Sequence, residues 1–446
     1  MALTGLQIYK LLPQTNCKEC GFATCLAFGM KLAAKQAELK LCPYVTDEAR
    51  GQLEAASAPP IRLITLASDG AKLEVGNETV LFRHEKTFVH RAGLFVRLGA
   101  DLGTDAIAAQ VAEADAYVVD YVGIKLGLDG FAIDARSGDA ATFGAAVSAA
   151  RAKTHKPLIL IASDTAVMAA GVEAAKGLRP LLCAADATNW AAMAELARTA
   201  KAPLVVRAET LEALAALTEQ VKAAGVEDIV LDPAVTGYAD SLTTLTHLRR
   251  LALKKNLRAL GYPILTFPGA AADVDEAILA AEQIAKYAGL VVLEAFDPAT
   301  LYPLLALRQN LYTDPQKPIQ VQPGLYEINA PDASAPLMVT TNFSITYFAV
   351  NNEVESSGRP AWLLVTDAEG MSVLTAWAAG KFDAERIAKG LKTSGVAERL
   401  SHKRLILPGQ VAVLSGELED ALPGWQIMVG PKEAVDIPNY LKLMWS

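Results

Sequence analysis

Short apolar runs alternate with Ala-rich helical stretches through the centre of the chain. Nine runs between residues 62 and 308 are almost continuously apolar, as expected of parallel strands buried on both faces. They are Leu63–Leu66, Leu94–Leu98, Tyr117–Tyr121, Leu158–Ala162, Leu181–Ala184, Leu204–Val206, Ile229–Leu231, Ile264–Thr266 and Val291–Leu293. Such spacing over roughly 250 residues predicts an eight-stranded, TIM-like (β/α)8 barrel with one additional run. Residues 72–84 are predicted to form a hairpin that turns at Gly76-Asn77 and caps the barrel.

A similar pattern restarts on a smaller scale near the C-terminus. Strands are predicted at Pro336–Thr340, Trp362–Thr366, Arg404–Pro408 and Trp425–Val429, each followed by a helix. Consecutive β/α units of this kind predict a doubly wound α/β domain. Proline-rich stretches at Ser57–Pro60 and Thr313–Gly324 are predicted linkers. The expected organisation is therefore a small domain at 1–57, the barrel at 60–312 and the α/β domain at 325–446.

Composition narrows the class of protein. The chain has 446 residues, is 52% hydrophobic and carries a formal charge of -8. No basic stripe is visible, so nucleic acid is not an expected partner. No run of about 18 uncharged apolar residues occurs, so no membrane span is expected. The N-terminus lacks a signal-peptide layout, which predicts a cytoplasmic protein.

Four of the five cysteines lie close together near the N-terminus. Cys17, Cys20, Cys25 and Cys42 have the spacing C-x2-C-x4-C-x16-C, and a proline follows the last of them. Such spacing favours an iron–sulfur cluster, and residues 1–57 are therefore a predicted cluster domain. A structural zinc is the alternative, although zinc sites usually pair two C-x2-C arms. The spacing does not fix the number of irons, and Cys183 is predicted to be a buried apolar residue.

Polar residues follow many of the predicted barrel strands, where barrel enzymes place their chemistry. They are Asp69, Asp120, Asp164, Asp186, Arg207, Glu209, Asp232, Thr266 and Glu294. Acidic residues at these positions can equally cap the following helices, and no His-carboxylate metal set appears among them. A structural or docking role is therefore favoured over catalysis for the barrel.

The loops after the C-terminal strands should meet at one edge of their sheet, where ligands bind in doubly wound folds. Gly370, Gly409 and Gly430 would permit close backbone approach to a flat ligand. Hydrogen bonds are available from Thr341, Asn342, Thr346 and Ser372, and an apolar surface from Met371, Val373 and Leu374. The alternative is that these glycines only make turns.

Taken together, these motifs carry a family resemblance that extends over the whole chain. The segments CKECGFATC, VTTNFSITYF, VTDAEGMSVLTAWAAGKF and LILPGQVAVLSGELED resemble the large (gamma) subunit of the corrinoid iron–sulfur protein of the reductive acetyl-CoA pathway. The resemblance implies a [4Fe-4S] cluster on the four N-terminal cysteines. It also implies a cobalamin-type corrinoid in the C-terminal domain, with matching positions at Thr340, Thr346, Gly370–Val373 and the loop around Glu433.

The same resemblance implies a methyl carrier, a component of a corrinoid-dependent methyltransferase system. Cobalt(I) would accept a methyl group from methyltetrahydrofolate on a separate methyltransferase, and methylcobalt(III) would pass it to acetyl-CoA synthase. The cluster would reactivate cobalt(II) by reduction. Implied partners are a small subunit that completes a heterodimer, the methyltransferase, and carbon monoxide dehydrogenase/acetyl-CoA synthase. No protein side chain is expected to be catalytic, since the cofactor carries the chemistry.

Two rival functions stay open at this point. One is an iron–sulfur redox enzyme with a catalytic barrel and no corrinoid, and the other is a scaffold subunit that holds only the cluster.

The histidines indicate how the cobalt would be held. None of the five, His84, His90, His155, His247 and His402, lies in a D-x-H-x-x-G loop. His402 precedes a strand and is expected at the edge opposite the ligand loops. Thr375 lies nearer the cobalt's lower face, but a neutral hydroxyl is a poor ligand. The corrinoid is therefore expected to be bound base-off, without a protein axial ligand.

Overall fold

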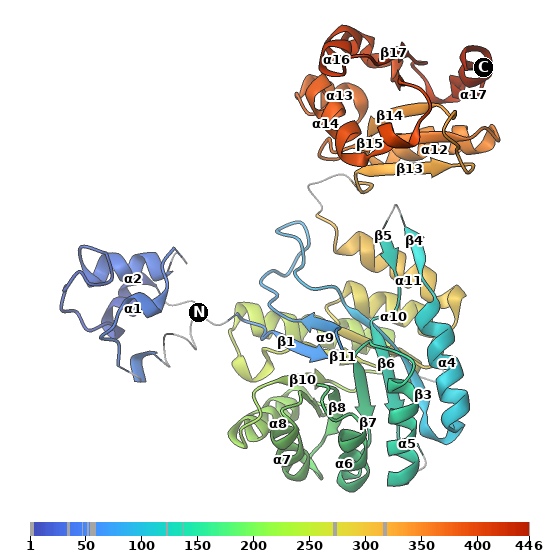
Figure 1. Ribbon diagram of the computed structural model, residues 1–446. Helices are drawn as coiled ribbons and strands as arrows, with labels where there is room; N and C mark the ends of the chain where they lie inside the picture. The colour runs from blue at the N-terminus through green and yellow to red at the C-terminus, as the bar shows by residue number, and fades with distance from the viewer. Residues whose placement is uncertain are drawn as a thin grey trace. The chain divides into compact units, whose positions relative to one another are not determined.

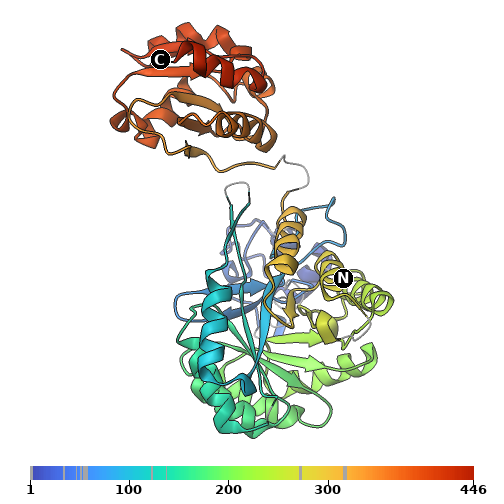
Figure 2. The ribbon, with the colours of Figure 1, turned by 90° about the vertical axis from the view of Figure 1, so that its right-hand side faces the viewer.

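The computed structural model describes residues 4–33, 36–46, 48–50, 53, 59–121, 124–136, 138–270, 274–314 and 319–445 (Figures 1 and 2). The chain divides into two compact units. One contains residues 1–117 and 127–312, and the other contains residues 118–126 and 313–446. The predicted linkers fall partly outside the described residues, at 57–58 and 315–318.

The N-terminal segment forms two short packed helices. Helix α1 (Gly5–Leu11) begins with a capping box, in which Gln7 N donates to Thr4 Oγ1 over 3.3 Å and Thr4 N donates to Gln7 Oε1 over 2.8 Å. Helix α2 (Cys25–Ala33) packs closely against it, because a Cβ at Gly29 would lie only 2.9 Å from the Gly5 carbonyl oxygen. A short 3-10 turn, η1 (Leu39–Leu41), follows.

Eight parallel strands form the predicted barrel, which is nearly closed. They are β3 (Gly93–Gly99), β6 (Gly130–Asp134), β7 (Leu158–Ile161), β8 (Leu181–Ala185), β9 (Leu204–Arg207), β10 (Ile229–Asp232), β11 (Leu265–Thr266) and β12 (Leu290–Leu293). Their order is β10-β9-β8-β7-β6-β3-β12-β11. A parallel bridge between Leu231 and Ile264 joins the two ends of this order, so the barrel prediction is confirmed.

Helices surround the barrel (Figure 1). They are α4 (Thr104–Ala116), α5 (Ala140–Arg151), α6 (Thr165–Ala174), α7 (Trp190–Ala200), α8 (Leu211–Ala223), α9 (Tyr238–Lys254), α10 (Glu276–Ala285) and α11 (Pro298–Leu311), with short 3-10 turns η2 (Ala100–Leu102), η3 (Arg258–Leu260) and η4 (Pro268–Ala270). Several begin at an aspartate. Asp164, for example, accepts hydrogen bonds from the backbone of Ala166 and Val167 at 2.8 and 3.0 Å. That carboxylate is a helix cap, the alternative left open from sequence.

Two of the nine predicted runs lie outside the barrel. Leu63–Leu66 overlaps β1 (Ile64–Ala67), which pairs antiparallel with β2 (Lys72–Val75), and Tyr117–Tyr121 overlaps β4 (Val119–Tyr121), which pairs antiparallel with β5 (Ile124–Leu126). The sequence reading missed β6 instead. Its apolar part is only three residues long, between a glycine and an aspartate, so its pattern is weak.

The predicted turn of the capping hairpin was wrong. The chain reverses at Gly70, which has φ +86°, where Ser68 N donates to the Ala71 carbonyl over 2.9 Å. Residues Ile64, Leu66 and Val75 then pack into the barrel core. Strand β1 therefore resembles a barrel strand in sequence, although its burial alternates, with Ile64 and Leu66 buried and the residue between them half-buried.

The C-terminal domain holds a five-stranded sheet in the order β13-β15-β14-β16-β17. The strands are β13 (Gly324–Ile328), β14 (Leu337–Thr341), β15 (Ala361–Thr366), β16 (Arg404–Leu407) and β17 (Gln426–Val429). All pairs are parallel except β13 with β15. The four predicted strands are present. The edge strand β13 was not predicted, because it begins where the proline-rich linker was expected to end.

Helices pack on both faces of this sheet, each over its own apolar core. They are α12 (Ser344–Ser356), α13 (Val373–Ala378), α14 (Ala384–Ser394), α15 (Val396–Arg399), α16 (Ser415–Ala421) and α17 (Ile437–Met444), with turns η5 (Gly409–Leu414) and η6 (Ala434–Asp436). From central β14 the chain builds outward to β15 and then crosses to β16 on the other side. This reversal creates a topological switch point between β14 and β16. Across the described chain, no helix has the length and apolar character needed to cross a membrane.

Candidate functional site

A pocket of about 440 Å³ opens at the switch point, beside the carboxyl ends of β14 and β16. It is lined by seven residues of the predicted site: Thr340, Thr346, Ser372, Val373, Leu374, Gly430 and Glu433. Further lining residues were not singled out from sequence, and they include Phe343, Ile345, Pro408, Gln410, Lys432 and Ile437. Several of these lie on the loops that the sequence indicated. The sequence therefore identified the loops that border the pocket, but not every side chain that lines it.

Thr340 supplies an unsatisfied polar group to this pocket. The residue is 1% exposed, and its Oγ1 has no hydrogen-bond partner among the described residues. Leaving a buried hydroxyl unpaired costs about 1–3 kcal/mol. A hydroxyl of this kind beside a pocket is suited to a ligand that completes its hydrogen bonding.

The rim of the pocket is unusually apolar for an exposed surface. Ile345 is 68% exposed and Leu374 is 47% exposed, and both line the pocket. Ser372 lies next to them, with its Oγ 3.0 Å from the Oγ1 of Thr375. Thr375 itself does not line the pocket. These residues together form an apolar surface that a ligand could contact, with hydroxyl groups at its edge.

Asn342 and Gly370 shape the loops rather than line the pocket. Asn342 Oδ1 accepts hydrogen bonds from the backbone of Ala368 and Gly370 at 2.9 and 3.0 Å. Its Nδ2 donates to Gln320 and Asp367, both over 3.2 Å. Gly370 has φ +72°, and a Cβ there would lie 2.6 Å from the Gln320 side chain. These contacts tie the loop after β15 to the end of β14.

Gly409 allows two loops to meet backbone to backbone. Its N–H donates to the Pro431 carbonyl over 2.9 Å, and a Cβ would lie 2.4 Å from the Gly430 carbonyl oxygen. The sequence predicted that this glycine lets the backbone approach a ligand. In the structure, its backbone instead approaches the loop after β17. Two further predicted residues, Thr341 and Met371, do not line the pocket: Thr341 is fully buried, and Met371 is partly buried against one of the two cores of the sheet.

The four N-terminal cysteines differ in their surroundings. Cys25 and Cys42 are buried in one apolar core, Cys20 packs against that core, and Cys17 is exposed. Asn16 accepts a hydrogen bond from Cys25 N over 2.8 Å, which ties the motif to the start of α2. Nowhere in the described part of the chain do three or more ligating side chains already converge closely enough to hold a metal ion.

At the barrel mouth, the predicted residue Glu294 takes part in a group of ion pairs with residues that were not predicted. Arg97 lies 2.6 Å from Asp134 and 2.5 Å from Glu294, and Arg136 lies 3.2 and 3.3 Å from the same two carboxylates. Asp69 and Asp120, expected at barrel strand ends, instead lie outside the barrel strands: Asp69 at the β1–β2 turn and Asp120 within β4.

Both ring nitrogens of His402 are engaged in local hydrogen bonds. Nε2 lies 2.9 Å from the Ala335 carbonyl oxygen, and the backbone N–H of Arg404 donates to Nδ1 over 3.2 Å. The residue precedes β16 and so lies at the strand end opposite the pocket, where sequence reasoning put it.

Comparison with known proteins gives full-length matches. A family model described as CO dehydrogenase/acetyl-CoA synthase delta subunit matches residues 63–441, and a family model for an Fe-S cluster matches residues 12–44. The corrinoid/iron-sulfur protein large subunit of Moorella thermoacetica is 44% identical over 442 residues, which cover 99% of each chain. The chain belongs to this family of corrinoid/iron-sulfur protein large subunits. The family resemblance expected from the motifs is thereby confirmed.

Archaeal proteins extend the family. The acetyl-CoA decarbonylase/synthase complex subunit gamma of Methanothermobacter thermautotrophicus is 35% identical and covers 100% of both chains. Among solved structures, a dihydropteroate synthase from Xanthomonas albilineans with 4-aminobenzoic acid is 16% identical with a TM-score of 0.40, covering 56% of this chain and 99% of that one.

Proposed function

We propose that the chain is the corrinoid-binding and cluster-binding subunit of a methyl-transfer system in the acetyl-CoA pathway. The observation that carries the proposal is the switch-point pocket with the unpaired Thr340 hydroxyl, in a chain 44% identical over its full length to a corrinoid/iron-sulfur protein subunit. A bound corrinoid would supply the methyl-accepting and methyl-donating centre, between methyltetrahydrofolate on a separate methyltransferase and acetyl-CoA synthase. The protein would act in the cytoplasm, as a methyl carrier, with a small subunit as its heterodimer partner.

The pocket residues fit a cobalamin-type corrinoid by their chemistry. A corrinoid has a flat macrocycle with amide groups around its rim. The hydroxyls of Thr340, Thr346 and Ser372 would hydrogen-bond those amides. The exposed side chain of Leu374, with the buried Val373 beside it in the pocket lining, would lie against the macrocycle, which would remove apolar surface from water. Gly430 and Glu433 would border it from the loop after β17, while Asn342, Gly370 and Gly409 would hold the loops in place.

The corrinoid would be bound base-off and without a protein axial ligand. The histidine of the C-terminal domain, His402, uses both ring nitrogens in local hydrogen bonds and lies at the opposite strand end. Without a strong axial donor, cobalt(II) is easier to reduce, which brings it within reach of a low-potential cluster. The proposed lack of an axial protein ligand would thus explain why the same chain also carries a cluster.

The four N-terminal cysteines would hold the [4Fe-4S] cluster in a domain spanning residues 1–57. Along the chain, a barrel at 60–312 and the corrinoid domain at 325–446 would follow. Thiolates are the ligands that such clusters use, and the buried sulfurs of Cys25 and Cys42 already share one core with Cys20 at its edge. The cluster would transfer electrons to reactivate the corrinoid and would take no part in methyl transfer.

Metal analysis of the anaerobically purified protein tests the proposal directly. About one cobalt beside about four irons per chain is the expected result. Iron without cobalt would contradict it and would favour the iron–sulfur redox enzyme with a catalytic barrel. A second experiment uses Cys20→Ala with corrinoid bound. This variant should lose reductive reactivation yet keep methylation that starts from chemically reduced corrinoid. Loss of both activities in a folded variant would disprove the separate role of the cluster.

A further inference from the structure

A second pocket, of about 430 Å³, opens at the mouth of the barrel. It lies at the carboxyl ends of the barrel strands, the end at which barrel proteins bind their ligands. Its charged lining residues are Arg97, Asp186, Arg207 and Asp232, and Ser163 and Thr236 add hydroxyl groups. The proposed methyl-carrier function does not use this pocket.

Asp232 is the last residue of β10 and is 2% exposed. Its Oδ1 accepts a hydrogen bond from Ala234 N over 2.8 Å. Its Oδ2 is buried and has no hydrogen-bond partner in the part of the chain that the structure describes. Burial raises the pKa of this carboxyl, although Arg207 opposes the shift. The site thus contains a buried acceptor atom that has not been satisfied.

Arg207 stands over this acceptor from the neighbouring strand. Its Nη1 lies 3.4 Å from Asp232 Oδ2, a separation at which the two charges attract without a hydrogen bond between them. The side chain is 51% exposed, so the guanidinium is available to a group entering from solvent. The Arg207 guanidinium, a donor, and Asp232 Oδ2, an acceptor, therefore lie side by side in the lining of the pocket.

Other carboxylates of the mouth accept their hydrogen bonds through one oxygen each. Asp134 Oδ2 accepts from Arg97 at 2.6 and 3.0 Å. Asp186 Oδ1 accepts from the Thr188 backbone and hydroxyl at 2.7 and 2.6 Å. Asp232 differs from both because its Oδ2 is buried and has no hydrogen-bond partner among the described residues. This contrast directs a ligand to the β9–β10 side of the mouth.

The remaining lining decides what kind of ligand fits. Two arginines and two aspartates line the pocket, so its formal charges balance and a neutral ligand is favoured. Its apolar lining consists of Ile161, Ala162, Cys183, Ala184, Ala234, Val235, Phe267 and Ala270. Phe267 offers an aromatic face on which a planar ring can stack. The volume is many times the roughly 30 Å³ that one water occupies in the liquid, so a single bridging water does not fill it.

We infer that the barrel mouth binds a small, neutral, planar nitrogen heterocycle that presents an N–H donor beside a carbonyl acceptor. The N–H donates to Asp232 Oδ2, and the carbonyl oxygen accepts from Arg207. The ring lies against Phe267 and the apolar wall. Binding thereby completes the hydrogen bonding of a buried carboxylate, which makes the pairing selective as well as attractive.

Equilibrium dialysis of the full-length protein, with its cofactors as purified, tests the inference with two probes. Isocytosine carries an amino group and a ring N–H next to a carbonyl. The control, 1,3-dimethyluracil, has the same ring size and two carbonyls but no N–H. Isocytosine should bind saturably, and 1,3-dimethyluracil should bind at least tenfold more weakly, because a hydrogen bond to a charged group contributes about 1.5–3 kcal/mol.

Variants then locate the site. Asp232→Asn keeps the shape and the bond to Ala234 N but places an amide N–H where the free oxygen was. Isocytosine should therefore bind at least tenfold more weakly to it, by the same reasoning. Asp164→Asn is the control, since that carboxylate caps α6 and does not line the pocket, and it should bind isocytosine as the parent does. Equal binding of the two probes, or unchanged binding to Asp232→Asn, would overturn the inference. If Asp232→Asn fails to fold, Arg207→Gln replaces it, because that half-exposed side chain can change without entering the core, and unchanged binding there would be equally decisive.

Discussion

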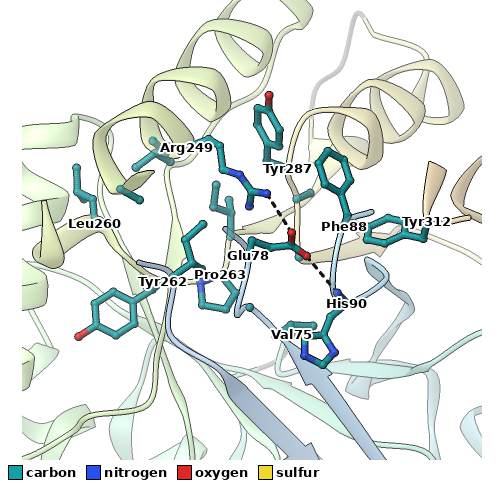
Figure 3. A pocket seen from close by; sticks show the side chains of 17 residues that line it. Val75, Glu78, Phe88, His90, Arg249, Leu260, Tyr262, Pro263, Tyr287 and Tyr312 are labelled. Atoms are coloured by element: carbon teal, nitrogen blue, oxygen red, sulfur yellow. Dashed lines mark hydrogen bonds and ion pairs between the residues drawn. The ribbon is translucent and has the colours of Figure 1, made fainter. Parts of the chain in front are cut away.

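Glu78 and Arg249 form a buried ion pair, in which Glu78 Oε2 and Arg249 Nη2 lie 3.1 Å apart (Figure 3). Their side chains are 11% and 3% exposed. Glu78 Oε1 also accepts from the backbone N–H groups of Val89 and His90 at 2.8 and 3.1 Å. Arg249 donates to the Val80 carbonyl and lies over the Tyr287 ring, 4.8 Å from its centroid. One pair thus fastens the segment after β2 to helix α9.

Removing one member of this pair should destabilise the barrel strongly. Arg249→Met leaves the Glu78 carboxylate buried beside an apolar side chain, and we expect a loss of about 3–5 kcal/mol in the free energy of unfolding. Urea denaturation followed by circular dichroism measures it. The matched control is Glu195→Gln, which breaks the exposed Glu195–Arg198 pair on α7 and should leave the free energy of unfolding nearly unchanged, because solvent screens that pair. Similar losses in both variants would show that burial does not distinguish the two pairs.

Most of the fold could be predicted from apolar runs, because seven of the nine runs form barrel strands and all four C-terminal runs form strands. The failures have a common cause. Strand β1 contributes Ile64 and Leu66 to the barrel core although it pairs with β2 outside the barrel sheet, so local pattern cannot distinguish it from a barrel strand. Strand β6 has too few apolar residues to be noticed, and its identity depends on pairing with β3 and β7, residues far away in sequence.

The switch-point pocket opens at the sheet edge that the sequence indicated, but only some of the residues that line it were predicted. Thr340 and Ser372 do line it, whereas Asn342 and Gly409 are used to join loops. Sequence identifies a loop rich in glycine and hydroxyl groups, yet it cannot say whether a glycine approaches a ligand or a neighbouring backbone. At the barrel mouth, similarly, sequence indicated Asp186 and Asp232 alike, and only the structure shows that Asp232 has a buried oxygen without a hydrogen-bond partner among the described residues.

The proposal that the N-terminal cysteines hold the cluster is tested by comparing one of them with a cysteine of the barrel core. Cys17→Ala removes an exposed thiolate, so we expect cluster iron and its visible absorbance to be lost while the barrel keeps its thermal stability. Cys183→Ala is the control, because Cys183 is buried in the barrel core, and that variant should keep its iron. Iron content by elemental analysis gives the answer. Full iron retention in Cys17→Ala would remove Cys17 from the ligand set.

The base-off proposal is tested at His402. EPR of the cobalt(II) state should show no superhyperfine splitting from an axial nitrogen, and His402→Ala should give the same spectrum. The variant should nevertheless lose stability, by about 1 kcal/mol, because the hydrogen bonds to Ala335 and Arg404 disappear. A spectrum split by nitrogen in the parent and unsplit in the variant would identify His402 as an axial ligand and refute the proposal.

The final prediction separates two neighbouring threonines of β14. Thr340 and Thr341 are both buried with an unpaired Oγ1 among the described residues, but successive residues of a strand point to opposite faces, and only Thr340 lines the pocket. Valine has nearly the same shape and removes the hydroxyl. Because neither hydroxyl is paired within the described chain, Thr340→Val and Thr341→Val should each leave the stability of the corrinoid-free protein unchanged or raise it by up to about 1 kcal/mol.

With corrinoid, the two variants should diverge. If Thr340 Oγ1 hydrogen-bonds the corrinoid, Thr340→Val should weaken corrinoid binding about tenfold, corresponding to one lost hydrogen bond of about 1.4 kcal/mol, whereas Thr341→Val should bind as the parent does. Titration of the corrinoid-free protein with cobalamin, followed by its visible absorbance, measures both affinities. Equal affinities in the two variants would mean that the unpaired hydroxyl of Thr340 is a cost of the fold, and the corrinoid would then have to be held by other groups of the pocket.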